Sequence, residues 1–147
     1  MTKRSQHFWI DAVLLACTVV SAAAAITVSK LSPLTKDDLR LEIADLRSFA
    51  QEGAQLTNQH LAGQTTQTFF DSQAEQIKDK VDSSLKSLRN SEVKPEIETD
   101  RRRAVNLAEQ LSSEFHRLST SQLELQRSGP RLKTLGKQLR EMEERMK

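Results

Sequence analysis

The sequence predicts an all-α protein with one N-terminal transmembrane helix followed by a long antiparallel helical hairpin that forms a coiled coil. Three observations lead to this fold class. Residues 12–28 form an uncharged, mostly apolar run. The chain as a whole is 29% charged and has only 3 prolines and 4 glycines, a composition typical of long helices. Beyond the run, apolar residues recur at intervals of three and four, which is the helical period.

Composition limits both the core and the classes of partner. A chain of 147 residues fits one domain, and its aromatic content of 4% is too low for a thick globular core. The 22 basic and 20 acidic residues give a net charge of +2. A nucleic-acid-binding domain needs a clear positive excess, so we expect no nucleic acid as a partner.

Residues 8–28 are predicted to be a signal anchor that crosses the membrane once. At the helical rise these residues span about 31 Å, which matches one hydrocarbon core. Residues 1–7 form a short basic tail, and Trp9 suits the membrane interface. We expect the tail to stay in the cytoplasm and the helical body to be exported across the inner membrane.

Small residues recur at every fourth position of this segment, at Cys17, Ser21 and Ala25, and predict a face for packing against another membrane helix. Two alternatives remain open. The Ala-rich end at residues 22–25 also fits a cleavable signal peptide, which would release a soluble exported protein. The single cysteine, Cys17, is a candidate for lipidation.

A linker at residues 29–35 precedes the helical domain, residues 36–147. Thr35, followed by Asp37 and Asp38, predicts a helix start because a threonine caps free N–H groups and acids favour the first turn. A turn is predicted near residues 90–95, because the residue before Pro95 disfavours the helical region. A further break is predicted near residues 128–130, at Ser-Gly-Pro.

The two arms of the hairpin, residues 36–90 and 96–147, are nearly equal in length. When the chain folds back near Val93, residues whose numbers add to about 186 face each other, such as Leu46 and Leu139. The apolar seams of the arms then coincide, with the spacing of a coiled coil. The predicted core consists of Leu39, Ile43, Leu46, Phe70, Ile77, Val81, Leu88, Val105, Leu111, Phe115, Leu118, Leu135, Leu139 and Met142.

Both arms are polar near their middles, which leaves a second architecture open. Gly63 and several threonines lower the helix propensity of residues 55–68, and the other arm weakens at residues 119–122. A bend there predicts a compact four-helix bundle with helices near 36–62, 69–90, 96–127 and 131–147. A polar seam of this kind also suits a small polar ligand.

No catalytic, cofactor-binding or metal site is predicted, and we do not expect an enzyme. His7, His60 and His116 are not at metal-ligand spacing, and nucleotide-binding and hydrolase motifs are absent from the sequence. The basic run at residues 101–103 follows acidic residues at helical spacing. We expect these acids to neutralise it.

These expectations favour a membrane-anchored scaffold or accessory subunit of a membrane complex. It would act through coiled-coil and transmembrane helix packing. Its partners would be the lipid bilayer and other protein subunits, or further copies of the chain. Two alternatives are a sensory or ligand-binding helical bundle and a soluble exported binding protein.

Overall fold

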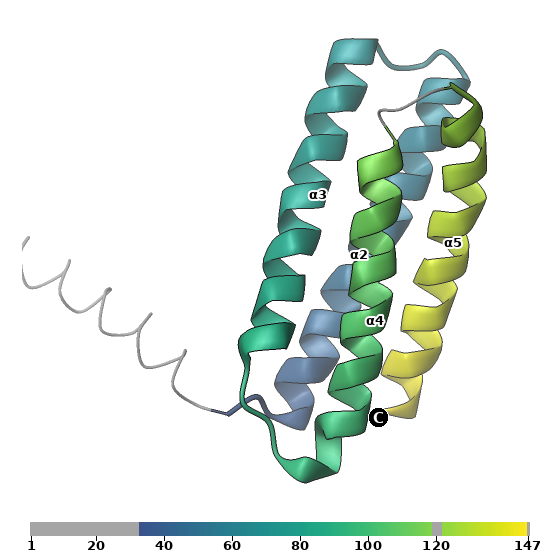
Figure 1. The fold of residues 1–147 in the computed structure, drawn as a ribbon. Coiled ribbons are helices and arrows are strands. Elements are labelled where there is room, and N and C mark those ends of the chain that lie inside the picture. The colour runs from purple at the N-terminus through teal and green to yellow at the C-terminus, as the bar shows by residue number, and fades with distance from the viewer. Residues whose placement is uncertain (1–32, 119–121, 147) are drawn as a thin grey trace, which may run out of the picture. The chain divides into compact units, whose positions relative to one another are not determined.

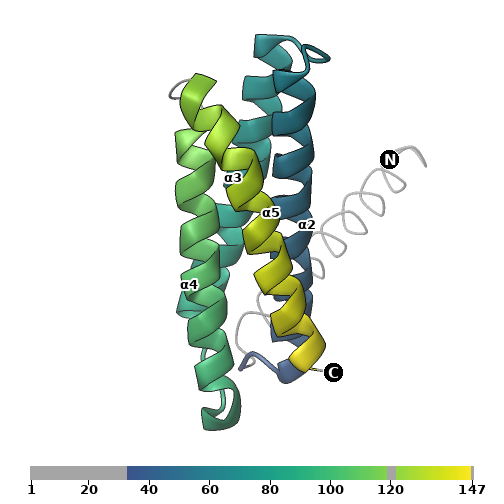
Figure 2. The ribbon, with the colours of Figure 1, turned by 90° about the vertical axis from the view of Figure 1, so that its right-hand side faces the viewer.

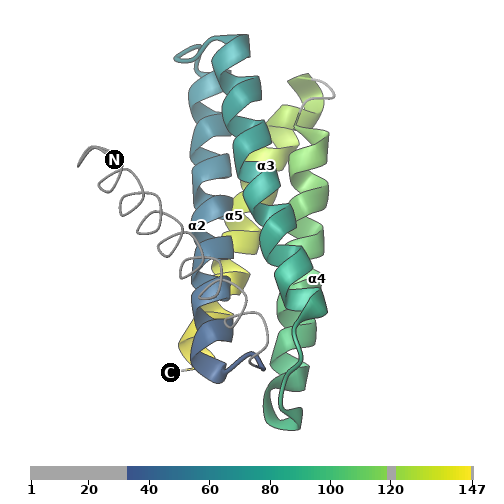
Figure 3. The same ribbon diagram turned by 90° about the vertical axis from the view of Figure 1, so that its left-hand side faces the viewer.

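The computed structural model describes residues 33–118 and 122–146. Four helices fill this part of the chain: α2 (Lys36–Leu61), α3 (Gln67–Asn90), α4 (Pro95–Arg117) and α5 (Gln122–Arg145). They run alternately up and down and pack side by side as a bundle (Figure 1). Figure 2 shows the face formed by α4 and α5, and Figure 3 the face formed by α2 and α3.

The all-α fold class is confirmed, and its form fits the compact four-helix bundle. The long two-helix hairpin is not the arrangement observed, because each arm is divided into two helices. The predicted transmembrane helix, with Cys17, Ser21 and Ala25, lies outside the described residues. Within residues 33–118 and 122–146, no helix is long and apolar enough to span a membrane.

The start of α2 is fixed by a capping box, as the sequence predicts. The Thr35 side chain accepts a hydrogen bond from the Asp38 N–H, and the Asp38 carboxylate accepts one from the Thr35 N–H. These bonds satisfy donors that the first helical turn leaves free. The Leu34 N–H donates to the Glu92 carbonyl at 2.8 Å, which ties this start to the α3–α4 turn.

The first arm bends at residues 62–66 because local turn chemistry ends one helix and begins the next. Gly63 has a φ of +70°, in the left-handed region that glycine adopts without strain. The His60 ring stacks on Phe70 with ring centroids 4.4 Å apart, which holds the two helices together. Thr66 then caps α3 by accepting from the Phe69 N–H.

The second arm is interrupted beside the weak stretch at residues 119–122, and the break predicted near residues 128–130 is wrong. α5 continues through residues 128–130 with Pro130 inside the helix, and the interruption falls between Arg117 and Gln122. Packing explains the continuity, because Ser128 and Gly129 are buried. A Cβ on Gly129 would lie 3.5 Å from the Thr57 side chain, so this small residue allows α5 to approach α2 closely.

In the bundle, α2 still packs against α5 and α3 against α4, as the two arms of the predicted hairpin would. Part of the predicted pairing of residues is therefore retained. Gly136 lies against Ala50, and Gly129 against Thr57, as the hairpin pairing of the two arms requires. The α3–α4 pair is shifted from that register. There the Ser112 hydroxyl donates to the Asp82 carboxylate at 2.6 Å.

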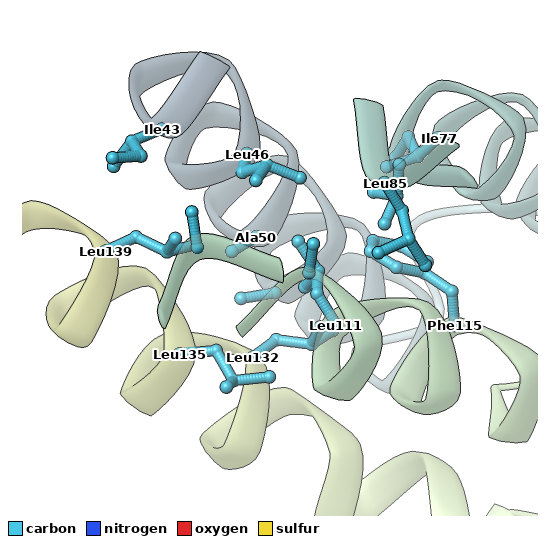
Figure 4. Packing of buried hydrophobic residues seen from close by; sticks show 14 of the residues in the cluster. Ile43, Leu46, Ala50, Ile77, Leu85, Leu111, Phe115, Leu132, Leu135 and Leu139 are labelled. Carbon is cyan, nitrogen blue, oxygen red and sulfur yellow. The ribbon is translucent and has the colours of Figure 1, made fainter. Parts of the chain in front are cut away.

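The core lies along the axis of the bundle, where side chains from all four helices converge (Figure 4). Thirteen of the fourteen predicted core residues are buried there, and Val105 is partly buried against them. The apolar seams are therefore covered within one chain.

At Gly53, side chains from two other helices pack against the backbone of α2. A Cβ at this position would lie 2.5 Å from Cζ of Phe115 in α4 and 3.3 Å from Cδ1 of Leu132 in α5. Phe115 is itself buried, with 3% of its surface exposed, so its ring has little room to move. The missing side chain therefore makes space for the phenyl ring.

We expect Gly53→Ala to lower the free energy of unfolding by about 1–3 kcal/mol, because overpacking outweighs the better helix propensity of alanine. The matched control is Gly136→Ala, whose Cβ would lie at an ordinary 3.5 Å from the Ala50 Cβ. This control should gain roughly 0.5–1 kcal/mol. Chemical denaturation of the full chain in detergent checks both, and equal effects of the two variants would contradict this account.

Candidate functional site

The two histidines within the described residues make local contacts in separate helices. His60 stacks on Phe70, and Nδ1 of His116 lies 2.9 Å from the Ser112 carbonyl oxygen, one turn earlier in α4. His7 lies outside the described residues. In residues 33–118 and 122–146, no group of three or more His, Cys, Asp and Glu residues could hold a metal ion.

The basic run at residues 101–103 fastens α4 to the end of α3. Arg101 donates to the Glu98 carboxylate and, through Nη1, to the Leu88 carbonyl at 2.9 Å. Arg102 donates to the same carboxylate at 2.7 Å. Arg101 and Arg102 thus share one acidic partner in their own helix, whereas Arg103 lines a groove.

This groove, the α4–α5 groove, is the first candidate site. It follows from the uneven packing of α5, which contacts α2 much more extensively than α4. Two adjoining hollows of about 600 and 410 Å³ share Gln138. They are lined by Arg103, Asn106, Leu107, Glu109, Gln110, Ser113, Glu114, Arg117, Pro130, Arg131, Thr134, Leu135, Gln138, Glu141, Met142 and Arg145.

A nearly buried carboxylate joins the two walls of the α4–α5 groove. Glu114, whose side chain is 10% exposed, lies 3.0 Å from Nη1 of Arg117 and 3.5 Å from Nη1 of Arg131. Its other oxygen accepts from the fully buried Ser128 hydroxyl at 3.2 Å. Because all three partners are donors, the burial of this charge is compensated.

Arginines at the other end of the α4–α5 groove have no such compensation. Within the described residues, no carboxylate forms an ion pair with Arg103 or Arg145. Arg145 donates only to the Glu141 carbonyl in its own helix. This end of the groove therefore offers positive charge to a partner.

The second candidate site is the α2–α5 groove, a hollow of about 660 Å³ on the other side of α5. Its floor contains the small residues Ala54 and Gly136, and its walls are long polar side chains. Five carboxamides and three cations contribute to it, and no carboxylate does. These are Gln51, Gln55, Asn58, Gln59, Gln64, Lys133, Lys137 and Arg140.

The sequence identifies only one wall of the α2–α5 groove. Four of its five carboxamides come from residues 55–68, the polar stretch that suggested a ligand. The cations were missed, although their signal is present: no acidic residue lies between Glu124 and Glu141, and Lys133, Lys137 and Arg140 share one face by helical spacing. The predicted core residues lie inside the bundle and line neither groove, except for Leu135 and Met142.

Comparison with known proteins adds no family to this description. No protein-family model matches the chain, and neither a curated protein nor a solved structure matches it significantly. The functional argument therefore rests on the grooves themselves.

We expect Glu114→Ala to lower the free energy of unfolding by about 1–3 kcal/mol, because the Ser128 hydroxyl stays buried after its partner is removed. The estimate allows for Arg117 and Arg131 being about half exposed to water. The control is Glu144→Ala, whose side chain is 58% exposed and should matter by less than about 0.5 kcal/mol. Chemical denaturation that ranks the two variants equally would exclude a structural role for the Glu114 cluster.

Acid should weaken the contact between α3 and α4. Hydrogen bonds from Arg101 and Arg102 lower the pKa of Glu98 from 4.5 to about 2. A carboxyl with a lowered pKa stabilises the fold above its unfolded pKa, and this contribution disappears as the pH falls through the folded value. Between about pH 4.5 and pH 2, Glu98→Gln should therefore lose less stability than the wild type, as measured by urea denaturation. If the free energy of unfolding falls equally with pH in Glu98→Gln and the wild type, the lowered pKa of Glu98 does not stabilise the fold.

Proposed function

We propose that this protein is a membrane-anchored accessory subunit whose helical bundle binds a partner subunit outside the inner membrane. The anchor is the apolar segment at residues 8–28, which is long enough for one span. Only residues 29–35 separate that segment from α2, a reach of at most about 25 Å.

The α4–α5 groove is the observation that carries this proposal. The burial of the apolar seams within one chain argues against an intermolecular coiled coil through those residues. A partner must then use an outer surface of the bundle. The α4–α5 groove runs along two helices. Its apolar lining is the partly buried Leu107 with the small exposed edges of the core residues Leu135 and Met142, and at one end lie two arginines that have no carboxylate partner among the described residues.

The occupant that fits this groove is an amphipathic helix of the partner subunit with acidic residues on its flanks. A helix laid between two others buries its apolar face in the groove they form. Arg103 and Arg145 lack carboxylate partners among the described residues, so acidic flanks would complement them.

A ligand-binding bundle is the second candidate function. The α2–α5 groove favours it, because its walls combine carboxamides and cations without a carboxylate. The two functions use opposite sides of α5 and are compatible with each other.

Site-specific photo-crosslinking in native membranes tests the subunit proposal. A photoreactive residue at Gln138, which lies in both hollows of the α4–α5 groove, should give one discrete adduct with another integral membrane protein. The same residue at exposed Gln76 on α3 should give none. Arg103→Glu with Arg145→Glu should lower the adduct yield by about tenfold or more, since each like-charge contact opposes docking.

The matched control is Lys80→Glu with Lys86→Glu, which makes the same charge change on α3. This control should leave the adduct unchanged. An adduct made only of copies of this chain, or one that survives the groove reversal, would refute the proposed partner. A mature chain that begins near Ile26, found by intact mass, would refute the anchor.

A further inference from the structure

We propose that the α2–α5 groove binds an acidic polysaccharide. The inference requires only the folded bundle and does not depend on the accessory-subunit function. Its first support is the row of cations along α5. Lys133, Lys137 and Arg140 are separated by four and three residues, so their side chains follow one face of the helix. Lys133 and Arg140 lie about 10 Å apart along the helix axis.

These cations are available to a ligand. Lys133 forms no ion pair with a carboxylate among the described residues. Lys137 lies 3.8 Å from Glu141 and Arg140 lies 3.8 Å from Glu144, and both acidic partners are about half exposed or more. Such long, solvated pairs contribute little to stability, so a bound anion can replace them.

The opposite wall provides groups that recognise hydroxyls. Gln51, Gln55, Asn58 and Gln59 project from successive turns of α2 into the groove. A carboxamide presents two donors and an acceptor, which matches the donor and acceptor character of a sugar hydroxyl. No carboxylate is among the residues that line the groove, and Glu141 and Glu144 lie behind the cations with which they pair.

The shape of the groove suits an extended chain. Ala54, Ala62 and Gly136 keep its floor free of large side chains. The close approach of α5 to α2, where a Cβ on Gly136 would lie 3.5 Å from Ala50, holds the two walls at a fixed spacing. A polymer with repeated anions and hydroxyls would contact the cations on one side and the carboxamides on the other.

The same features disfavour a nucleic acid. Proteins that bind single strands stack the bases on aromatic side chains, and no aromatic side chain lines this groove. The chain also lacks the positive excess of a nucleic-acid-binding protein, with 22 basic and 20 acidic residues. The carboxamide wall instead favours a partner rich in hydroxyls.

Calorimetric titration of the full chain in a non-ionic detergent tests the proposal with four probes. These are a hyaluronan tetrasaccharide, neutral chitotetraose, tripolyphosphate and a short oligothymidylate. We expect hyaluronan to bind most tightly and its affinity to fall with rising salt. Lys133→Gln with Lys137→Gln should weaken that binding by about tenfold or more, because charge-assisted contacts are lost.

Two further double variants separate the parts of the site. Gln55→Ala with Asn58→Ala should weaken hyaluronan binding several-fold without changing its salt dependence. Lys86→Gln with Lys94→Gln removes the same charge from exposed positions outside α5 and should have no effect. Circular dichroism establishes that each variant keeps its helical content.

The failures are distinct. Absence of hyaluronan binding, or equal loss in the control variant, would overturn the site. Tripolyphosphate binding as tight as hyaluronan, or an unchanged carboxamide variant, would reduce the groove to a general anion site and overturn the polysaccharide assignment. Tighter oligothymidylate binding would assign the groove to a nucleic acid instead. None of these results bears on the crosslinking from Gln138 in the α4–α5 groove.

Discussion

The contact between the Phe115 ring and the bare backbone of Gly53 sets how closely α4 can approach α2. It brings α4 toward α2 across the middle of the bundle, and Leu132 of α5 approaches the same position. α2 consequently contacts all three other helices, whereas α3 and α5 make no mutual contacts within the described residues. α5 therefore packs mainly on one neighbour. A groove lies on each side of α5, and these two grooves are the candidate sites.

The core was predictable because a hairpin and its folded-over form bury the same residues. Bending both arms at matching levels leaves each helix beside the segment it would contact in the straight hairpin, as Gly136 against Ala50 illustrates. Apolar periodicity reports which face of a helix is buried and carries no information on whether the helix bends further along. Turn chemistry decides between the two forms, through the left-handed Gly63 and the stacking of His60 on Phe70. Gly63 can be recognised in the sequence, whereas the stacking of His60 on Phe70 forms only once the chain has turned.

The second bend shows where local rules fail. Ser128, Gly129 and Pro130 form the strongest helix-breaking signal in the last third of the chain, yet α5 passes through them. From sequence alone, small residues that allow two helices to pack closely cannot be distinguished from small residues that form a turn. Here burial of Ser128 and Gly129 against neighbouring helices compensates for poor propensity and a missing donor. Of the two weak places that the sequence indicates in this arm, only the one before Gln122 interrupts the helix, and the continuous α5 brings the Ser128 hydroxyl within reach of Glu114.

The candidate sites were less predictable than the core for a related reason. A binding groove requires two helices in register, and a sequence pattern describes one helix at a time. The carboxamides of α2 stood out because they interrupt a seam, whereas Lys133, Lys137 and Arg140 resemble any solvated face until α2 is placed beside them. The bundle also changes what the apolar pattern implies about function. The apolar seams are buried within one chain, so the residues that line the two grooves beside α5 are mostly polar. The periodic apolar residues thus define the bundle, whereas the candidate sites depend on residues that the apolar pattern leaves outside it.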